Sequence, residues 1–198
     1  MSKVRLNDNE KKFQEKNEYL IPKQATYFVE PLTNDETFGV VIRKLDIVND
    51  VLSATNKNTS EDGATRMEVI RQHLNYLVRT YKILVFEEQF VKDDEKQKYG
   101  KVEGNRKVMS AVNLLQFCKL FGSGEIHSAH RVHPKCEHKD VFRVSNNPEI
   151  GCYTPNGLGS VGWHNDGSFM QNGYSHAVYQ IVETPQGGNT QYAHLVSK

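Results

Sequence analysis

The chain has 198 residues, with 25 Lys and Arg against 24 Asp and Glu, and a formal net charge of +1. This length suits one domain with a real hydrophobic core, and the balanced charge disfavours nucleic-acid binding, which calls for a basic excess. No apolar run approaches a membrane span, the N-terminus lacks the apolar segment of a signal peptide, and three cysteines form no paired framework. We therefore expect a soluble, cytoplasmic protein that binds neither nucleic acid nor a membrane.

The N-terminal region precedes the predicted domain. Residues 1–25 are polar and charged and are expected to form an arm ahead of a single domain at 26–198. The first clear strand pattern is the β-branched run at 37–42, which a charged pair follows.

Two amphipathic helices are predicted around a short buried strand. Apolar residues recur at helical spacing between Thr65 and Tyr81, with arginine and glutamine on the other side. The apolar run at 83–86 suits a buried strand. A second helix follows, with Gly122 in the position of a C-terminal cap. Its candidate core positions are Val112, Leu115, Leu120 and Phe121.

The second half of the chain is predicted to be rich in strands and turns. Strands are expected at 140–144, at 177–182 and again at 190–193. Turn sequences with Asn, Pro and Gly separate them. The first half is therefore mixed and the second half β-rich, which indicates an α+β protein.

A histidine and a carboxylate lie two residues apart in the stretch Gly162–Phe169, which also contains large aromatic side chains. On a strand, side chains at i and i+2 point to the same face, so His164 and Asp166 would both reach one metal ion. One imidazole and one carboxylate form two thirds of the 2-His-1-carboxylate set that holds non-haem Fe(II). Because the chain has eight histidines, this pair taken alone also fits a chance occurrence.

A second group of metal-binding residue types lies between Glu125 and His138, with His127, His130, His133 and Cys136 among them. Mixed Cys and His ligands are typical of structural zinc sites. The segment lacks the two separated ligand pairs of finger-like sites, which favours a solvated loop in which one histidine lines a pocket. A zinc module stays open as a weaker alternative.

Four stretches, taken in order, resemble the TauD/TfdA family of taurine dioxygenase-like enzymes, which use Fe(II) and 2-oxoglutarate. They are an apolar strand leading to Gln89, a helix leading to Phe121-Gly122, the Trp-His-x-Asp-x-Ser-Phe motif at 163–169, and a Pro-x-Gly-Gly-Asn-Thr turn ending at Thr190. The resemblance covers roughly residues 37–195, with the order and approximate spacing of the family.

The resemblance implies a double-stranded β-helix, jelly-roll-like as in clavaminate synthase, with flanking helices. It implies that His164 and Asp166 bind iron, and that the hydroxyl of Thr190 contacts a carboxylate of the cosubstrate 2-oxoglutarate. His127 matches a substrate-contacting histidine, and Phe169 an aromatic at the border of the pocket. The implied reaction uses O₂ to hydroxylate a small anionic organic substrate, with release of succinate and CO₂.

The sequence departs from the family near its end. The family supplies a distal histidine and one or two cosubstrate-binding arginines later in the chain, whereas this sequence ends at Lys198. We therefore expect the N-terminal portion of such an enzyme, with C-terminal barrel strands missing, and we do not expect His194 to be the third ligand. Asn189 also replaces the usual Asp. A non-catalytic relative that acts as a binding protein is the alternative.

Overall fold

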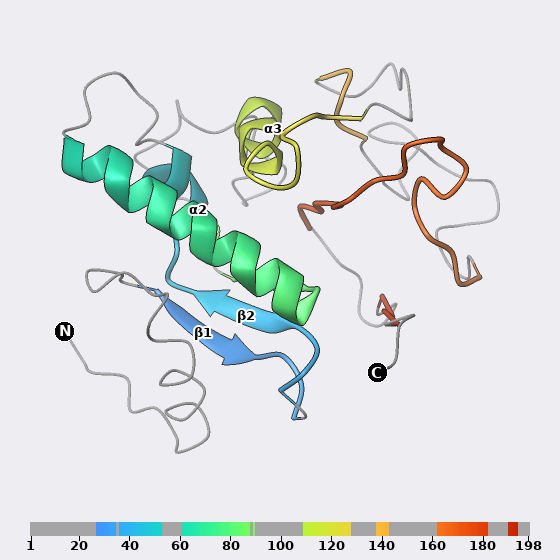
Figure 1. Cartoon of the computed structure of the whole chain (residues 1–198), viewed down its shortest axis with the longest axis horizontal. Helices are drawn as coiled ribbons and strands as arrows, with labels where there is room; N and C mark the ends of the chain where they lie inside the picture. The colour runs from blue at the N-terminus through green and yellow to red at the C-terminus, as the bar shows by residue number, and fades with distance from the viewer. Residues whose placement is uncertain are drawn as a thin grey trace, which may run out of the picture.

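The computed structural model describes residues 27–34, 36–52, 61–87, 89, 109–127, 138–142, 162–181 and 190–193, with the backbone alone for 61–66. In these residues the protein is a mixed α+β structure with a small open sheet of three strands and no closed β-helix (Figure 1). The predicted arm at 1–25 lies outside the described residues. No helix in the described ranges is long and apolar enough to cross a membrane.

The sheet has the order β1-β2-β3, with strands β1 (Phe28–Pro31), β2 (Val40–Arg43) and β3 (Leu84–Phe86). β2 pairs antiparallel with β1 and parallel with β3. Arg43 connects the three strands, because its Nε lies 2.6 Å from Glu30 Oε2 and its guanidinium also pairs with Glu87, directly after β3.

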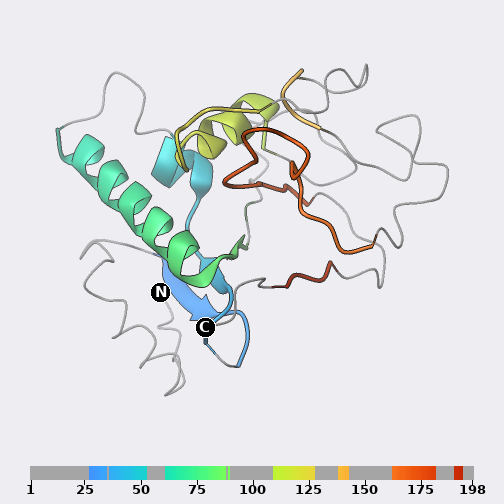
Figure 2. The same ribbon diagram turned by 45° about the vertical axis from the view of Figure 1, so that its right-hand side comes forward.

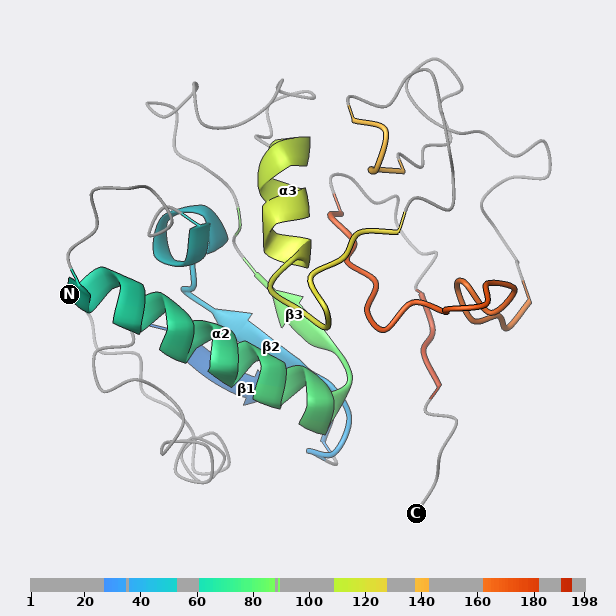
Figure 3. The same ribbon diagram turned by 45° about the horizontal axis from the view of Figure 1, so that its top comes forward.

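Helix α2 (Glu61–Tyr81) crosses one face of this sheet (Figures 1 and 3). Its buried stripe repeats at helical spacing and meets the buried residues of β1 and β2 in one hydrophobic core. The fully buried members are Val29, Val40, Ile42, Ile70, Leu74 and Leu77. The parallel pairing of β2 with β3 needs such a crossover helix, because parallel strands cannot be joined by a tight hairpin.

Two shorter helical segments extend the core: η1 (Ile47–Leu52), a π-helical turn, and α3 (Ala111–Cys118). The Ser110 side chain begins α3 by accepting a hydrogen bond from the backbone N–H of Asn113. Gln89 holds the start of η1, since its Oε1 accepts from the backbone N–H of Ile47 at 3.0 Å and its Nε2 donates to the carbonyl of Leu45. Gln89, which follows β3, therefore has a structural role.

The structure confirms the first predicted helix and the strand after it. The burial predicted for this strand is wrong, because β3 lies at the edge of the described sheet and all three of its residues are only partly buried. The helix begins at Glu61, four residues before the expected start, and ends at Tyr81 as predicted. The strand expected at 37–42 is observed as β2 at Val40–Arg43, slightly later in the chain. The shift arises because Gly39 has a φ of +86°, which ends the preceding turn and does not belong to a strand.

Two details of the second predicted helix are wrong. Val112 is exposed and not a core residue, whereas Phe117, which was not predicted, is buried. The helix ends at Cys118 with Lys119 as its cap, three residues before Gly122, because tighter i→i+3 bonds follow it, such as Leu120 N–H to Phe117 O at 3.1 Å. Phe121 is buried as expected.

The C-terminal segment 162–181 is irregular chain, and its later part approaches the turn that follows α3 (Figure 2). The strands predicted at 140–144, 177–182 and 190–193 are not observed in the described residues of these ranges, 140–142, 177–181 and 190–193. Strand residues need a neighbouring strand for their backbone hydrogen bonds, and the described sheet ends at β3. The segment contacts the core through His176, whose ring centroid lies 5.6 Å from that of Phe121, and through the partly buried Val178.

Candidate functional site

The His164–Asp166 pair lies in a turn and not on a strand. The backbone N–H of Ser168 donates to Asn165 O at 3.2 Å, and that of Met170 donates to Gly167 O at 2.9 Å. The turn nevertheless brings the two side chains together, with His164 Nε2 3.3 Å from Asp166 Oδ1. Both side chains are accessible, at 59% and 47% exposure. The expected proximity is confirmed, although the expected strand geometry is not its cause.

The other groups around the pair fix its orientation. His164 Nδ1 lies 3.0 Å from the carbonyl oxygen of Gly162, which favours the proton on Nδ1 and leaves Nε2 as the acceptor. The hydroxyl of Tyr179 donates to Asp166 Oδ2 at 2.5 Å. Partial burial, and then this hydrogen bond, raise the pKa of Tyr179 above its usual value, so the hydroxyl remains a donor at neutral pH.

The donor atoms of His164 and Asp166 suit a shared divalent cation. Metal–ligand bonds of about 2.1 Å at right angles place adjacent ligand atoms about 3 Å apart, close to the distance between Nε2 and Oδ1. A hydrogen bond on the second imidazole nitrogen and another on the second carboxylate oxygen are typical of metal ligands. Within the described ranges, no third His, Cys, Asp or Glu joins the pair to make a group of three. The residues present therefore fit two positions of a metal site.

The Tyr174 ring lies between His127 and the His164 turn. The ring centroid of His127 is 5.6 Å from that of Tyr174. Tyr174 in turn packs against Gly167, where a Cβ atom would lie 2.8 Å from the tyrosine ring. Gly167 also has a φ of +74°, so both its backbone conformation and this close contact require glycine next to Asp166.

The two remaining predicted site residues are both exposed. Phe169 is in the same turn as Asp166 and is 77% exposed, so its side chain does not close a pocket in the described residues. Thr190 is exposed in the short described segment 190–193. The phenol of Tyr192, two residues later, is close enough to Tyr179 to contribute to the raised pKa of that residue. The segment with Thr190 therefore lies near Tyr179, the residue whose hydroxyl bonds Asp166.

The candidate zinc segment is described at its two ends. His127 and His138 line the same open pocket of about 740 Å³, with Glu125 and Asp140. His138 Nδ1 lies 3.7 Å from Asp140 Oδ2 and accepts from the backbone N–H of Asp140 at 3.2 Å. The other candidate ligands, His130, His133 and Cys136, lie outside the described residues.

Sequence reasoning did not identify Tyr179 or Tyr174 as site residues. Tyr179 was assigned to a strand, and its bond with Asp166 joins residues 13 apart in an irregular segment. Tyr174 contacts His127 across 47 residues of sequence. Neither contact follows a helical or strand period, so only the tertiary structure reveals it.

The chain matches no protein-family model, no curated protein and no solved structure.

Proposed function

We propose that this protein is an Fe(II)- and 2-oxoglutarate-dependent dioxygenase that hydroxylates a small anionic organic substrate. The observation that carries the proposal is the 3.3 Å approach of His164 Nε2 to Asp166 Oδ1 in an accessible turn. The order of the sequence motifs around this pair supports the same function. We also propose that the protein has a jelly-roll-like double-stranded β-helix fold.

In this proposal, His164 and Asp166 hold Fe(II) through the facing nitrogen and oxygen atoms. Thr190 contacts a carboxylate of 2-oxoglutarate, and His127 contacts the substrate. When bound, Fe(II), 2-oxoglutarate and O₂ supply the oxidising chemistry and release succinate and CO₂. Tyr179 holds the Asp166 carboxylate by its second oxygen, so that Oδ1 remains directed at His164.

Succinate formation tests the enzymatic part of the proposal. Purified protein with Fe(II), ascorbate, O₂ and 2-oxoglutarate is expected to form succinate, and more rapidly with a substrate from a panel of small organic acids. His164→Ala should abolish this activity. His176→Ala is the matched control, because it removes another histidine of the same segment. The His176 ring is partly buried against Phe121, with 5.6 Å between ring centroids, and lies outside the pair.

A non-catalytic binding protein is the second candidate function. It is favoured by one observation, the lack of a third His, Cys, Asp or Glu beside the pair within the described residues. A divalent cation bound by His164 and Asp166 without any 2-oxoglutarate-dependent succinate would support this candidate and refute the enzyme.

A further inference from the structure

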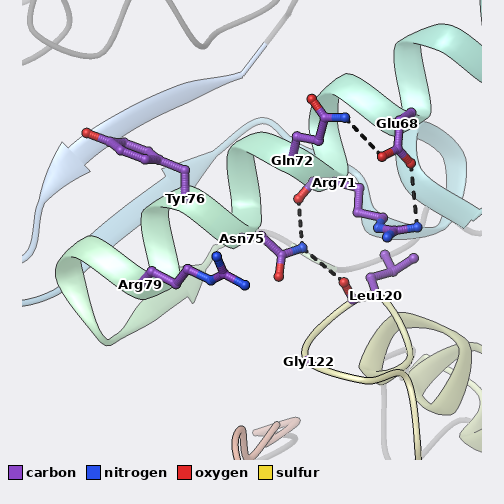
Figure 4. Close-up of a pocket in the computed structure, with 8 residues that line it drawn as sticks. All are labelled: Glu68, Arg71, Gln72, Asn75, Tyr76, Arg79, Leu120 and Gly122. Carbon is purple, nitrogen blue, oxygen red and sulfur yellow. Dashed lines mark hydrogen bonds and ion pairs between the residues drawn. The ribbon is translucent and has the colours of Figure 1, made fainter.

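A polar pocket of about 390 Å³ lies on the face of α2 that points away from the sheet (Figure 4). One wall is a polar stripe of α2 with the exposed residues Glu68, Arg71 and Arg79 and the partly buried Asn75. The other wall is the turn after α3, with Leu120 and Gly122. None of its lining residues belongs to the His164 turn or to the other predicted site residues. The pocket is therefore a separate concave feature with its own chemistry.

The two walls are fixed to each other by specific contacts. The Nδ2 of Asn75 donates to Arg71 O at 2.9 Å and to Leu120 O at 3.0 Å, which joins the helix to the turn. Gly122 has a φ of +59°, and a Cβ there would lie 2.7 Å from Ser175 Oγ. A third segment thus packs against the turn from outside. The pocket shape is held by these contacts and does not depend on one loop alone.

The pocket carries an excess of positive charge. Arg71 and Arg79 lie two helical turns apart on the same stripe, with Asn75 between them (Figure 4). Arg71 NH1 is 3.5 Å from Glu68 Oε2, but both side chains are about half exposed, so this pair contributes little. None of the ion pairs among the described residues involves Arg79. The pKa of His176 is lowered first by the partial burial of its imidazole and then by the positive charge of Arg79.

A charged helix face is usually just solvated, but three observations favour a ligand here. The surface is concave, its walls are tied together by Asn75, and one guanidinium has no acidic partner among the described residues. A guanidinium presents a planar fork of donors that matches carboxylate and phosphate. We propose that this pocket binds a small organic anion, whose carboxylate or phosphate group lies between Arg71 and Arg79.

Calorimetric titration tests this proposal, with EDTA present and ionic strength held constant. The probes are inorganic phosphate and succinate, and the tighter of the two identifies the anionic group that the pocket prefers. The intact protein should show saturable binding, and Arg79→Gln should weaken it at least about tenfold. Lys139→Gln is the matched control, since it removes one positive charge at a lysine that is 80% exposed and outside the pocket, and it should bind as the wild type does.

If Arg79→Gln does not fold, as judged by circular dichroism, Arg79→Lys takes its place, because it keeps the charge and loses the planar fork; the same weakening is expected. Equal weakening in Lys139→Gln would show general charge attraction and overturn the proposal, as would the lack of saturable binding. Anion binding should persist in His164→Ala. Succinate binding that is lost in His164→Ala and kept in Arg79→Gln would place the anion at the predicted iron pair and refute a separate pocket.

Discussion

The sheet and its helices differ sharply from the C-terminal segment that carries the candidate site. In the first region, large apolar side chains from β1, β2, η1, α2 and α3 form one buried cluster. In the segment 162–181, large apolar side chains lie mostly in solvent, including Trp163 at 72%, Phe169 at 77% and Ile181 at 63% exposure. We therefore expect substitutions in the first region to change mainly the stability of the fold, and substitutions in the second region to change mainly the candidate site.

The largest effect is expected from a core truncation in α2. Leu74 is fully buried between the helix and the sheet, so Leu74→Ala should lower the free energy of unfolding by about 3 kcal/mol through lost burial and a residual cavity. Ile181→Ala, the matched truncation in the exposed segment, should change it by less than about 0.5 kcal/mol. Urea unfolding measures both values, and equal losses would contradict the division into two regions.

Acid should destabilise the first region through His73. This side chain is 1% exposed, and burial lowers its pKa from 6.5 to about 4. In the unfolded chain the imidazole takes up a proton below about pH 6.5, whereas the folded protein resists protonation until about pH 4. Stability should therefore fall by up to about 3 kcal/mol as pH decreases across this window.

Urea midpoints at pH 7.5 and pH 4.5 measure this dependence. Because carboxylates also titrate at acidic pH, the informative quantity is the difference between the wild type and His73→Gln. The variant should lose much less stability on acidification than the wild type. The same pH dependence in both proteins would show that His73 is not responsible.

A smaller loss is expected where Tyr27 meets His73. The hydroxyl of Tyr27 lies 2.6 Å from His73 Nδ1, and His73 Nε2 has no hydrogen-bond partner among the described residues. Tyr27→Phe would remove the hydrogen bond to His73 Nδ1 as well. The loss should lower the free energy of unfolding by about 1–2 kcal/mol. Tyr192→Phe, at an exposed position, serves as the control and should have little effect. A Tyr27→Phe protein as stable as the wild type would refute this role of the bond.

Gly122 joins the two regions and gives the smallest predicted change. Alanine there would adopt a φ of +59° and press its Cβ against Ser175, so Gly122→Ala should cost about 1 kcal/mol in unfolding free energy. Gly162→Ala is the matched control, because nothing lies within 4 Å of a Cβ at that position. Indistinguishable thermal unfolding of the two variants would argue against the close packing of the turn on the segment 162–181.

Sequence patterns predicted the first region better than the second, for physical reasons. The helical spacing of Ile70, Leu74 and Leu77 marks a face that must be buried, so α2 was predictable. β1 was not predicted, because it is four residues long and ends in proline. In the second region, contacts such as Tyr179 with Asp166 arise in irregular chain that has no periodic signal.

The proximity of His164 to Asp166 was predicted from the correct residues with the wrong local structure. A spacing of two residues brings side chains together on a strand, but here a turn does so. Aromatic exposure at Phe169 was not predictable from composition, because the same residue type is buried at Phe117 and Phe121. Local spacing therefore identified candidate ligands, while the environment of each ligand depended on the fold.

An anaerobic titration tests most directly whether His164 and Asp166 form part of an Fe(II) site, as we propose. Fe(II) is added to the protein with 2-oxoglutarate while the visible charge-transfer band of the iron chelate is recorded. We predict a band that saturates at one iron per chain, disappears in His164→Ala and remains in His176→Ala. No saturable band, or the same band in His164→Ala, would contradict the account.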